Sequence, residues 1–252
     1  MTLNFEGIGE KIAIINGTTG KNIPILCVGD GARQDYKQVN LKDNETFQHI
    51  PNINKDFEVL YITGQSGSGK SWYTAQYCLQ YKALFPKRPI YLFSSLSDDK
   101  GSLDLVKGIK RVKLNQEFIN DENITMDELR ESLCIFDDVD NLTKQLKIKV
   151  WILMNSILQT GRHFKTSAII TYHLPSNSHE TRLILNECSS ITMFPSTMGG
   201  KSLKYMLDTY LGLDNKEIKR IKKIKSRWIT VFKTYPKVIL AQHEAFIPSL
   251  DD

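Results

Sequence analysis

Residues 64–71 read Gly64-Gln65-Ser66-Gly67-Ser68-Gly69-Lys70-Ser71 and match the pattern G-x-x-x-x-G-K-[ST] without a gap or substitution. The apolar run 57–62 precedes this stretch, and a helix-like stretch follows it from Ser71 to Leu84, before Pro86. A strand, a glycine-rich turn and a helix in this order can cradle phosphates, because glycines let the backbone approach closely and turn its N–H groups inward. The helix start adds the positive end of its dipole. The order therefore predicts a nucleotide site rather than a simple glycine-rich turn.

The motif also assigns roles to individual side chains. Lys70 is expected to reach the β- and γ-phosphates, and the Ser71 hydroxyl is expected to ligate Mg²⁺. The residues predicted to bind the nucleotide are Gly64, Gln65, Ser66, Gly67, Ser68, Gly69, Lys70 and Ser71.

Composition limits the class of protein. The chain has 252 residues, 41% of them hydrophobic, which is enough to bury a sizeable core. Its net charge of +5 permits a nucleic-acid partner without requiring one. None of the four cysteines forms a C-x-x-C pair, so we expect neither a zinc site nor a disulfide framework, and a reducing compartment fits best. We find no signal peptide and no apolar run of the roughly 18 residues that a membrane span needs, and therefore expect no membrane partner.

The second informative stretch is Leu133-Cys134-Ile135-Phe136-Asp137-Asp138. Four apolar residues that end in two acids indicate a buried parallel strand, and the carboxyl ends of such strands form the ligand-binding edge of α/β sheets. Here Asp137 is predicted to hold Mg²⁺ and Asp138 to orient or deprotonate the attacking water. The alternative is a strand that simply stops in a polar turn.

A third buried strand, 166–172, ends at His173, whose side chain is predicted to touch the γ-phosphate or the attacking water. The alternative is a structural, hydrogen-bonded histidine. A helix with an apolar face runs from Gln145 to Gln159 and is expected to end at Gly161, which leaves Arg162 in a polar turn. An arginine there suits an edge that meets a neighbouring subunit, where it could stabilise the charge of phosphoryl transfer.

The alternation of strands and helices predicts an α/β fold, namely a P-loop NTPase with a mostly parallel sheet and helices on both faces. A small N-terminal β-hairpin is expected within residues 11–28, followed by a polar loop over 29–56, and a C-terminal β-hairpin is expected within 228–241. We predict two domains, an N-terminal β/loop extension at 1–54 and an ATPase domain at 55–252. An extra strand between the glycine loop and the acidic strand favours the ATPase branch, with ATP as the nucleotide.

A basic helix is predicted from Asp214 to Lys225, with Asp214 and Glu217 capping its start. Isoleucines recur at every third position and are expected to pack inward. The outward cations predicted to bind DNA are Lys219, Arg220, Lys222 and Lys223. The alternative is an ordinary solvated helix face.

The glycine loop, the Phe136-Asp137-Asp138 ending and the run 159–163 before the third strand resemble the viral DNA-packaging ATPases of the FtsK/HerA superfamily. Within it they are most similar to the poxvirus-type enzymes of large DNA viruses and virophages. The resemblance covers roughly residues 55–200 and implies an ATP-driven homo-oligomeric ring that moves double-stranded DNA into a preformed capsid. Asp138 replaces a glutamate and His173 replaces a glutamine or asparagine of many such motors.

The resemblance also implies partners and a location. The partners would be double-stranded DNA, capsid or portal-vertex proteins, and further copies of the chain. The location would be the viral assembly site in the host cytoplasm, with the virion as an alternative. It points to Arg162 as a residue that acts on the neighbouring subunit.

Two other function classes stay open on the sequence. A small-molecule or nucleoside kinase also carries the glycine loop, but it gives the basic C-terminal helix no role. A nucleotide-binding assembly scaffold would bind ATP without turnover if Asp138 cannot position water.

Overall fold

The computed structural model describes residues 1–20, 22–96, 102–120, 124–176 and 181–248. The chain forms two compact units. The central unit is Lys55–Cys188, and the flanking unit joins Met1–Asn54 to Ser189–Asp252.

The central unit holds a parallel sheet with the strand order β6-β10-β9-β7-β8. Each neighbouring pair in this order is parallel. The acidic strand and its neighbour are fully buried, as expected for strands whose two faces are both covered. The strands are β6 (Val59–Thr63), β7 (Ile90–Ser94), β8 (Ile109–Lys113), β9 (Leu133–Phe136) and β10 (Ser167–Tyr172).

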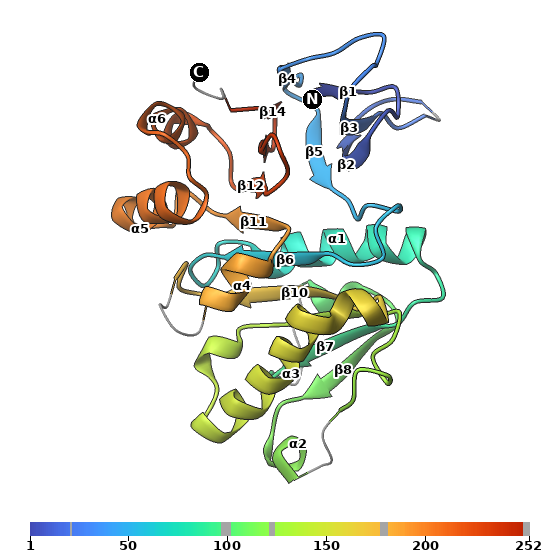
Figure 1. Ribbon diagram of the computed structural model, residues 1–252, viewed down its shortest axis with the longest axis vertical. Coiled ribbons are helices and arrows are strands. Elements are labelled where there is room, and N and C mark those ends of the chain that lie inside the picture. The colour runs from blue at the N-terminus through green and yellow to red at the C-terminus, as the bar shows by residue number, and fades with distance from the viewer. Residues whose placement is uncertain (21, 97–101, 121–123, 177–180, 249–252) are drawn as a thin grey trace. The chain divides into compact units, whose positions relative to one another are not determined.

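Two long helices connect these strands in opposite directions along the sheet. Helix α1 (Lys70–Leu84) links β6 to β7, three strands away, whereas α3 (Lys144–Phe164) links β9 back to β10. Because such crossovers are right-handed, opposite directions place the two helices on opposite faces. In Figure 1, α3 runs in front of the parallel strands. The remaining helical elements are η1 (Leu103–Leu105), α2 (Gln116–Asn120), η2 (Val139–Asn141) and α4 (Arg182–Glu187).

The α3 helix does not end where the sequence predicts. It continues through Gly161 to Phe164, and the left-handed residue that ends it is Lys165, with φ of 56°. Packing explains the glycine, because a Cβ on Gly161 would lie 2.6 Å from the Phe57 ring and 2.7 Å from the Thr166 carbonyl oxygen. Arg162 therefore lies in the last turn of the helix, not in a loop after it.

The flanking unit contains antiparallel strands. One sheet has the order β1-β3-β2-β5, and β11, β12, β13, β14 and β4 pair in sequence as a second antiparallel set. The strands are β1 (Thr2–Asn4), β2 (Glu10–Asn16), β3 (Ile25–Gly29), β4 (Gln38–Asn40), β5 (Thr46–His49), β11 (Ser190–Met193), β12 (Ile229–Phe232), β13 (Val238–Ala241) and β14 (Glu244–Phe246). The helical elements are α5 (Gly200–Tyr205), the π-helical turn η3 (Met206–Tyr210) and α6 (Asn215–Lys223).

Both predicted hairpins are present, as β2–β3 and β12–β13. The predicted loop 29–56 is wrong in part, because it contains β4 and β5, whose short alternating patterns are weak strand signals. A unit boundary coincides with the predicted domain boundary after residue 54, and the compact units group residues 189–252 with the N-terminal residues. The division into folding domains stays a prediction. Among the described residues, no helix has the length and apolar character to cross a membrane.

Candidate functional site

The glycine loop connects the carboxyl end of β6 to the first residue of α1. Gly67 and Gly69 have φ of 75° and 114°, in the left-handed region that favours glycine. A Cβ on Gly67 would meet nothing within 4 Å, so its backbone conformation, rather than contact with a neighbour, calls for glycine there. The outer rim of the loop, Gln65 to Gly67, is exposed, whereas Ser68 and Lys70 are buried.

Lys70 is held over this loop. Its Nζ donates a hydrogen bond of 3.0 Å to the Gly64 carbonyl oxygen and lies 3.4 Å from Oδ1 of Asp138. The side chain is only 5% exposed, and burial of an ammonium is unfavourable without such partners. Ser71 follows in the first turn of α1 and is half-buried.

The two acids after β9 differ in environment. Asp137 is 5% exposed, and its backbone N–H donates to the Phe93 carbonyl oxygen of the neighbouring strand. Asp138 is one-third exposed and has a left-handed backbone, with φ of 50° and ψ of 42°. This conformation is uncommon outside glycine, although aspartate tolerates it better than most residues. Here it accompanies a carboxylate that faces Lys70.

Thr171 joins the acids to β10, and sequence reasoning missed it. Its Oγ1 accepts a 2.9 Å hydrogen bond from the Asp138 backbone N–H. The same oxygen lies 3.0 Å from Oδ1 of Asp137 and 3.3 Å from Oδ1 of Asp138, and its single hydrogen can serve one of them at a time. The available signal was a polar residue near the end of an apolar strand.

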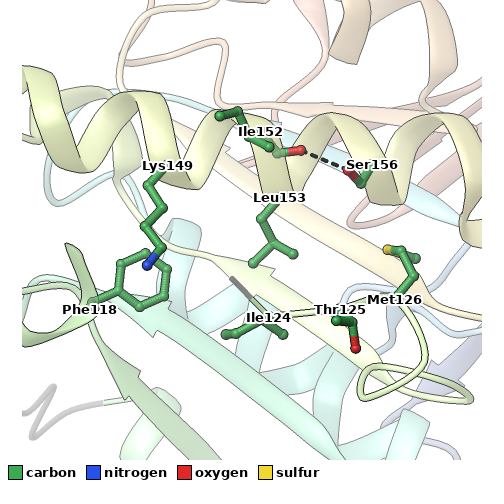
Figure 2. A pocket seen from close by; sticks show the side chains of 8 residues that line it. All are labelled: Phe118, Ile124, Thr125, Met126, Lys149, Ile152, Leu153 and Ser156. Atoms are coloured by element: carbon green, nitrogen blue, oxygen red, sulfur yellow. Dashed lines mark hydrogen bonds between the residues drawn. The ribbon is translucent and has the colours of Figure 1, made fainter. Parts of the chain in front are cut away.

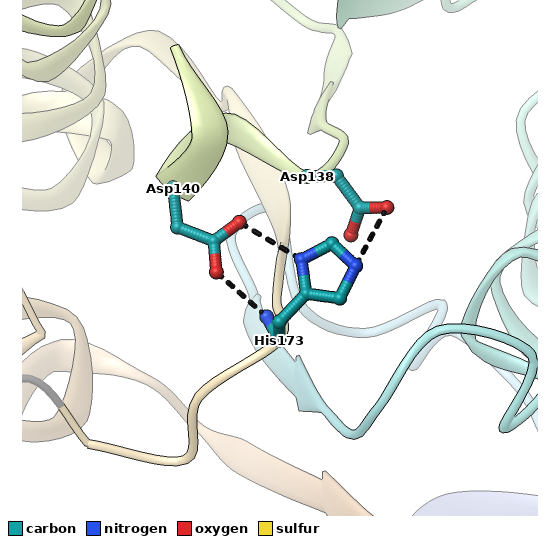
Figure 3. A group of neighbouring side chains, drawn as sticks. All are labelled: Asp138, Asp140 and His173. Carbon is teal, nitrogen blue, oxygen red and sulfur yellow. Dashed lines mark hydrogen bonds and ion pairs between the residues drawn. The ribbon is translucent and has the colours of Figure 1, made fainter.

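His173 lies beyond β10 between two carboxylates (Figure 3). Its Nε2 is 3.5 Å from Oδ2 of Asp138, and its Nδ1 is 3.2 Å from Oδ1 of Asp140. The donor atoms of Asp138, Asp140 and His173 all lie within 4.8 Å of one another, and their oxygen and nitrogen atoms are of types that can ligate a cation. Asp140 was also missed, although it stands only two residues after Asp138.

The structure thus brings the glycine loop, both acids and His173 to one edge of the sheet. It does not bring Arg162 there. Arg162 is exposed in the last turn of α3, before the first residue of β10, whereas His173 follows the last residue of β10. Arg162 therefore lies at the opposite edge from the phosphate loop.

The predicted DNA-binding helix is α6 of the flanking unit. Asp214 caps it by accepting from the Glu217 backbone N–H at 2.7 Å, as predicted. Lys219, Lys222 and Lys223 are exposed. Arg220 is engaged elsewhere: its guanidinium lies 3.4 Å from the centre of the Phe246 ring, and Nη2 donates to Gln38.

A separate cavity of about 240 Å³ lies in the central unit (Figure 2). Its lining residues are Phe118, Ile124, Thr125, Met126, Lys149, Ile152, Leu153 and Ser156, and none is a predicted site residue. Lys149 Nζ donates to the Ile119 carbonyl oxygen at 3.3 Å, which engages the one cation among the lining residues.

Two buried cysteines of the central unit, Cys78 and Cys134, offer no nucleophile. Burial raises the pKa of the Cys134 thiol on β9 to about 12 and also raises the pKa of Cys78 on α1. Both thiols therefore stay protonated at neutral pH.

Comparisons with known proteins agree with this architecture. No protein-family model matches the chain. A curated relative, the uncharacterized protein V3 of Sputnik virophage, is 41% identical over 191 residues, which cover 75% of this chain and 76% of the relative.

Two solved structures share the fold. One is B204, the DNA-packaging ATPase from Sulfolobus turreted icosahedral virus, with a TM-score of 0.51, 16% identity and coverage of 78% of this chain and 99% of that chain. The other is the genome packaging NTPase B204 from Sulfolobus turreted icosahedral virus 2 in complex with ATP-γS, with a TM-score of 0.50, 15% identity and coverage of 75% and 97%. The predicted α/β P-loop NTPase fold is confirmed.

Thr171→Val should destabilise the central unit by about 1–3 kcal/mol, because it removes a hydroxyl that bonds the acidic segment while it keeps the side-chain shape. Thr171→Ser keeps the hydroxyl and is the matched control. Urea denaturation of the three proteins measures the effect. A Val variant that is more stable than the Ser variant would show that the hydroxyl does not hold the acids.

Proposed function

The chain belongs to the same family as the uncharacterized protein V3 of Sputnik virophage, and we propose that it is an ATP-hydrolysing motor that moves double-stranded DNA into a viral capsid. That relative is uncharacterized, so the proposal rests on the site and on the resemblance to packaging ATPases.

The observation that carries the proposal is the ion pair between Lys70 and Asp138 at the mouth of the glycine loop. Hydrolysis needs a lysine that contacts the phosphates and a carboxylate that orients water within one site. Here Lys70 Nζ lies 3.4 Å from Oδ1 of Asp138. A kinase would use the same acid to accept the proton of an acceptor hydroxyl, so the assays below separate the two classes.

The residues fit Mg²⁺ and ATP. The exposed rim of the loop and its two left-handed glycines suit close approach of a phosphate to backbone N–H groups. Ser71 and Asp137 provide the hard oxygen ligands that Mg²⁺ prefers. When bound, Mg-ATP supplies the phosphoryl group that passes to water, with its charges partly neutralised by the metal.

The chain's own groups then have separate tasks. Lys70 leaves Asp138 and places its charge against the transferring phosphoryl oxygens. Asp138 accepts a hydrogen bond from the attacking water, and Thr171 keeps the backbone of Asp138 in place. His173 lies next to Asp138 and contributes through it.

Two features support DNA as the polymer, and the resemblance to ring-forming motors leads us to include a homo-oligomeric ring as the assembly. B204 of Sulfolobus turreted icosahedral virus, which shares the fold, is a DNA-packaging ATPase. The exposed cations of α6 offer a face for DNA phosphates. We include capsid or portal-vertex proteins as partners, and the assembly site in the host cytoplasm, or the virion, as the location.

Lys70→Ala should lower ATP turnover by at least ~10²-fold, because a preorganised charge on the reacting phosphate is lost. Asp137→Ala should lower it similarly through loss of Mg²⁺. Asp138→Asn should keep ATP binding and stop hydrolysis. Lys87→Ala removes an exposed lysine in the turn after α1 and is the control. Phosphate release is the measurement, and equal turnover in wild type and Lys70→Ala would exclude this site.

The same assay separates the function classes. Stimulation by double-stranded DNA supports the motor. Transfer of the γ-phosphate to a nucleoside or metabolite in an acceptor screen would support the kinase, and binding of ATP without turnover would support the scaffold.

DNA affinity should fall with salt at a log–log slope of about −0.9 for each phosphate contact. Replacing Lys219, Lys222 and Lys223 with Gln should therefore flatten the slope by up to about 2.7, which is the sum over three contacts. The control replaces three exposed lysines outside α6, namely Lys42, Lys87 and Lys107, with Gln and removes the same charge. Equal slopes for the two triple variants would assign DNA contact to another surface.

Arg162 is proposed to act on a neighbouring subunit, since its own phosphate loop lies at the other edge of the sheet. Arg162→Ala should then bind ATP normally and hydrolyse it poorly, whereas an excess of Asp138→Asn subunits should restore part of the activity. Turnover measured on mixtures at several ratios tests this. Full activity of Arg162→Ala alone would make Arg162 a surface residue, and no gain on mixing would mean that Arg162 is structural or acts within its own chain.

A further inference from the structure

We propose that Asp140 is a positioning residue that fixes His173, and that His173 in turn holds the carboxylate of Asp138 in its working direction. The inference rests on the proposed function in one respect, which is that Asp138 is the acid that orients water.

Asp140 holds His173 at two points, as Figure 3 shows. Its Oδ2 accepts a 2.9 Å hydrogen bond from the His173 backbone N–H, and its Oδ1 lies 3.2 Å from Nδ1 of the ring. The side chain of Asp140 is 12% exposed, and it sits in the short turn η2 directly after the acidic strand. A residue tied by both backbone and side chain has little freedom to rotate its ring.

The ring held in this way directs its second nitrogen at Asp138. A hydrogen on Nδ1 donates to Asp140, because a carboxylate only accepts. Nε2 faces Oδ2 of Asp138 at 3.5 Å and holds this carboxylate when it also carries a hydrogen, because a bare Nε2 is an acceptor. When both nitrogens carry hydrogen, the ring donates to a carboxylate on either side. The amide of Asn141, whose Nδ2 is 3.2 Å from Nδ1, competes for the opposite tautomer.

The contact between His173 and Asp138 gains importance when nucleotide binds. Asp138 has Lys70 beside Oδ1 and His173 beside Oδ2. Under the proposed function Lys70 turns to the phosphates, and its hold on Asp138 weakens. Asp138 is one-third exposed and could then rotate toward solvent. His173 keeps the carboxylate in place, and Asp140 keeps His173 in place.

A double-mutant cycle tests this chain of contacts. Asp140→Ala should lower kcat for ATP by ~10–100-fold and leave KM within about twofold, because misplacement by about 1 Å can cost such a factor in rate. His173→Ala should lower kcat to a similar extent. The double variant should be no slower than His173→Ala, since Asp140 acts through His173. Asp140→Asn keeps an oxygen for the His173 backbone N–H and should recover part of the loss.

A second readout does not depend on turnover. In protein labelled with ¹⁵N-histidine, the His173 ring signals, assigned by their loss in His173→Ala, should change in Asp140→Ala. They should stay unchanged in Asp127→Ala, a control at an exposed aspartate.

The two readouts have distinct consequences. Unchanged ring signals in Asp140→Ala, or a double variant slower than His173→Ala by the full Asp140→Ala factor, would overturn the inference. If the wild type does not hydrolyse ATP, the proposed function fails, and the ring signals alone decide whether Asp140 positions His173.

Discussion

The candidate site depends on the register between β9 and β10. Phe136 pairs with Ile170, so the next residue of each strand, Asp137 and Thr171, emerge side by side. The Thr171 hydroxyl then bonds both the acidic backbone and an acidic side chain. Because a slip by one residue turns every side chain to the other face, the same register that buries the apolar residues also places the acids. The register between β9 and β10 therefore determines both the packing of the core and the geometry of the site.

Charge balance is the second constraint. Lys70 is buried at the end of the glycine loop, which offers it the Gly64 carbonyl oxygen, and Asp138 after β9 offers it a carboxylate. A buried ammonium without partners would be strongly unfavourable. Asp138 satisfies this need from a left-handed backbone, with its carboxylate 3.4 Å from the ammonium. A few strained or charged groups gathered in this way are more typical of a functional site than of a structural turn.

The site lies wholly within Lys55–Cys188, whereas the basic face of α6 belongs to the flanking unit. Hydrolysis and polymer contact would thus be assigned to different compact units. Such a division suits a motor, because a change at the phosphate site must be converted into displacement of a surface that holds the polymer. Arg220, which stacks on Phe246, helps to anchor α6 rather than to extend its exposed cations.

The sequence by itself determined the glycine loop, the buried acidic strand, both hairpins and the capped basic helix, because each rests on local spacing, periodicity or turn chemistry. It did not determine Thr171, Asp140, the engagement of Arg220 or the role of Gly161. Those depend on which strands become neighbours and on contacts between residues far apart in the sequence, such as hydrogen bonds that span 33 or more residues. Hydrogen bonds of that range follow from strand order and register, and only the tertiary structure fixes both.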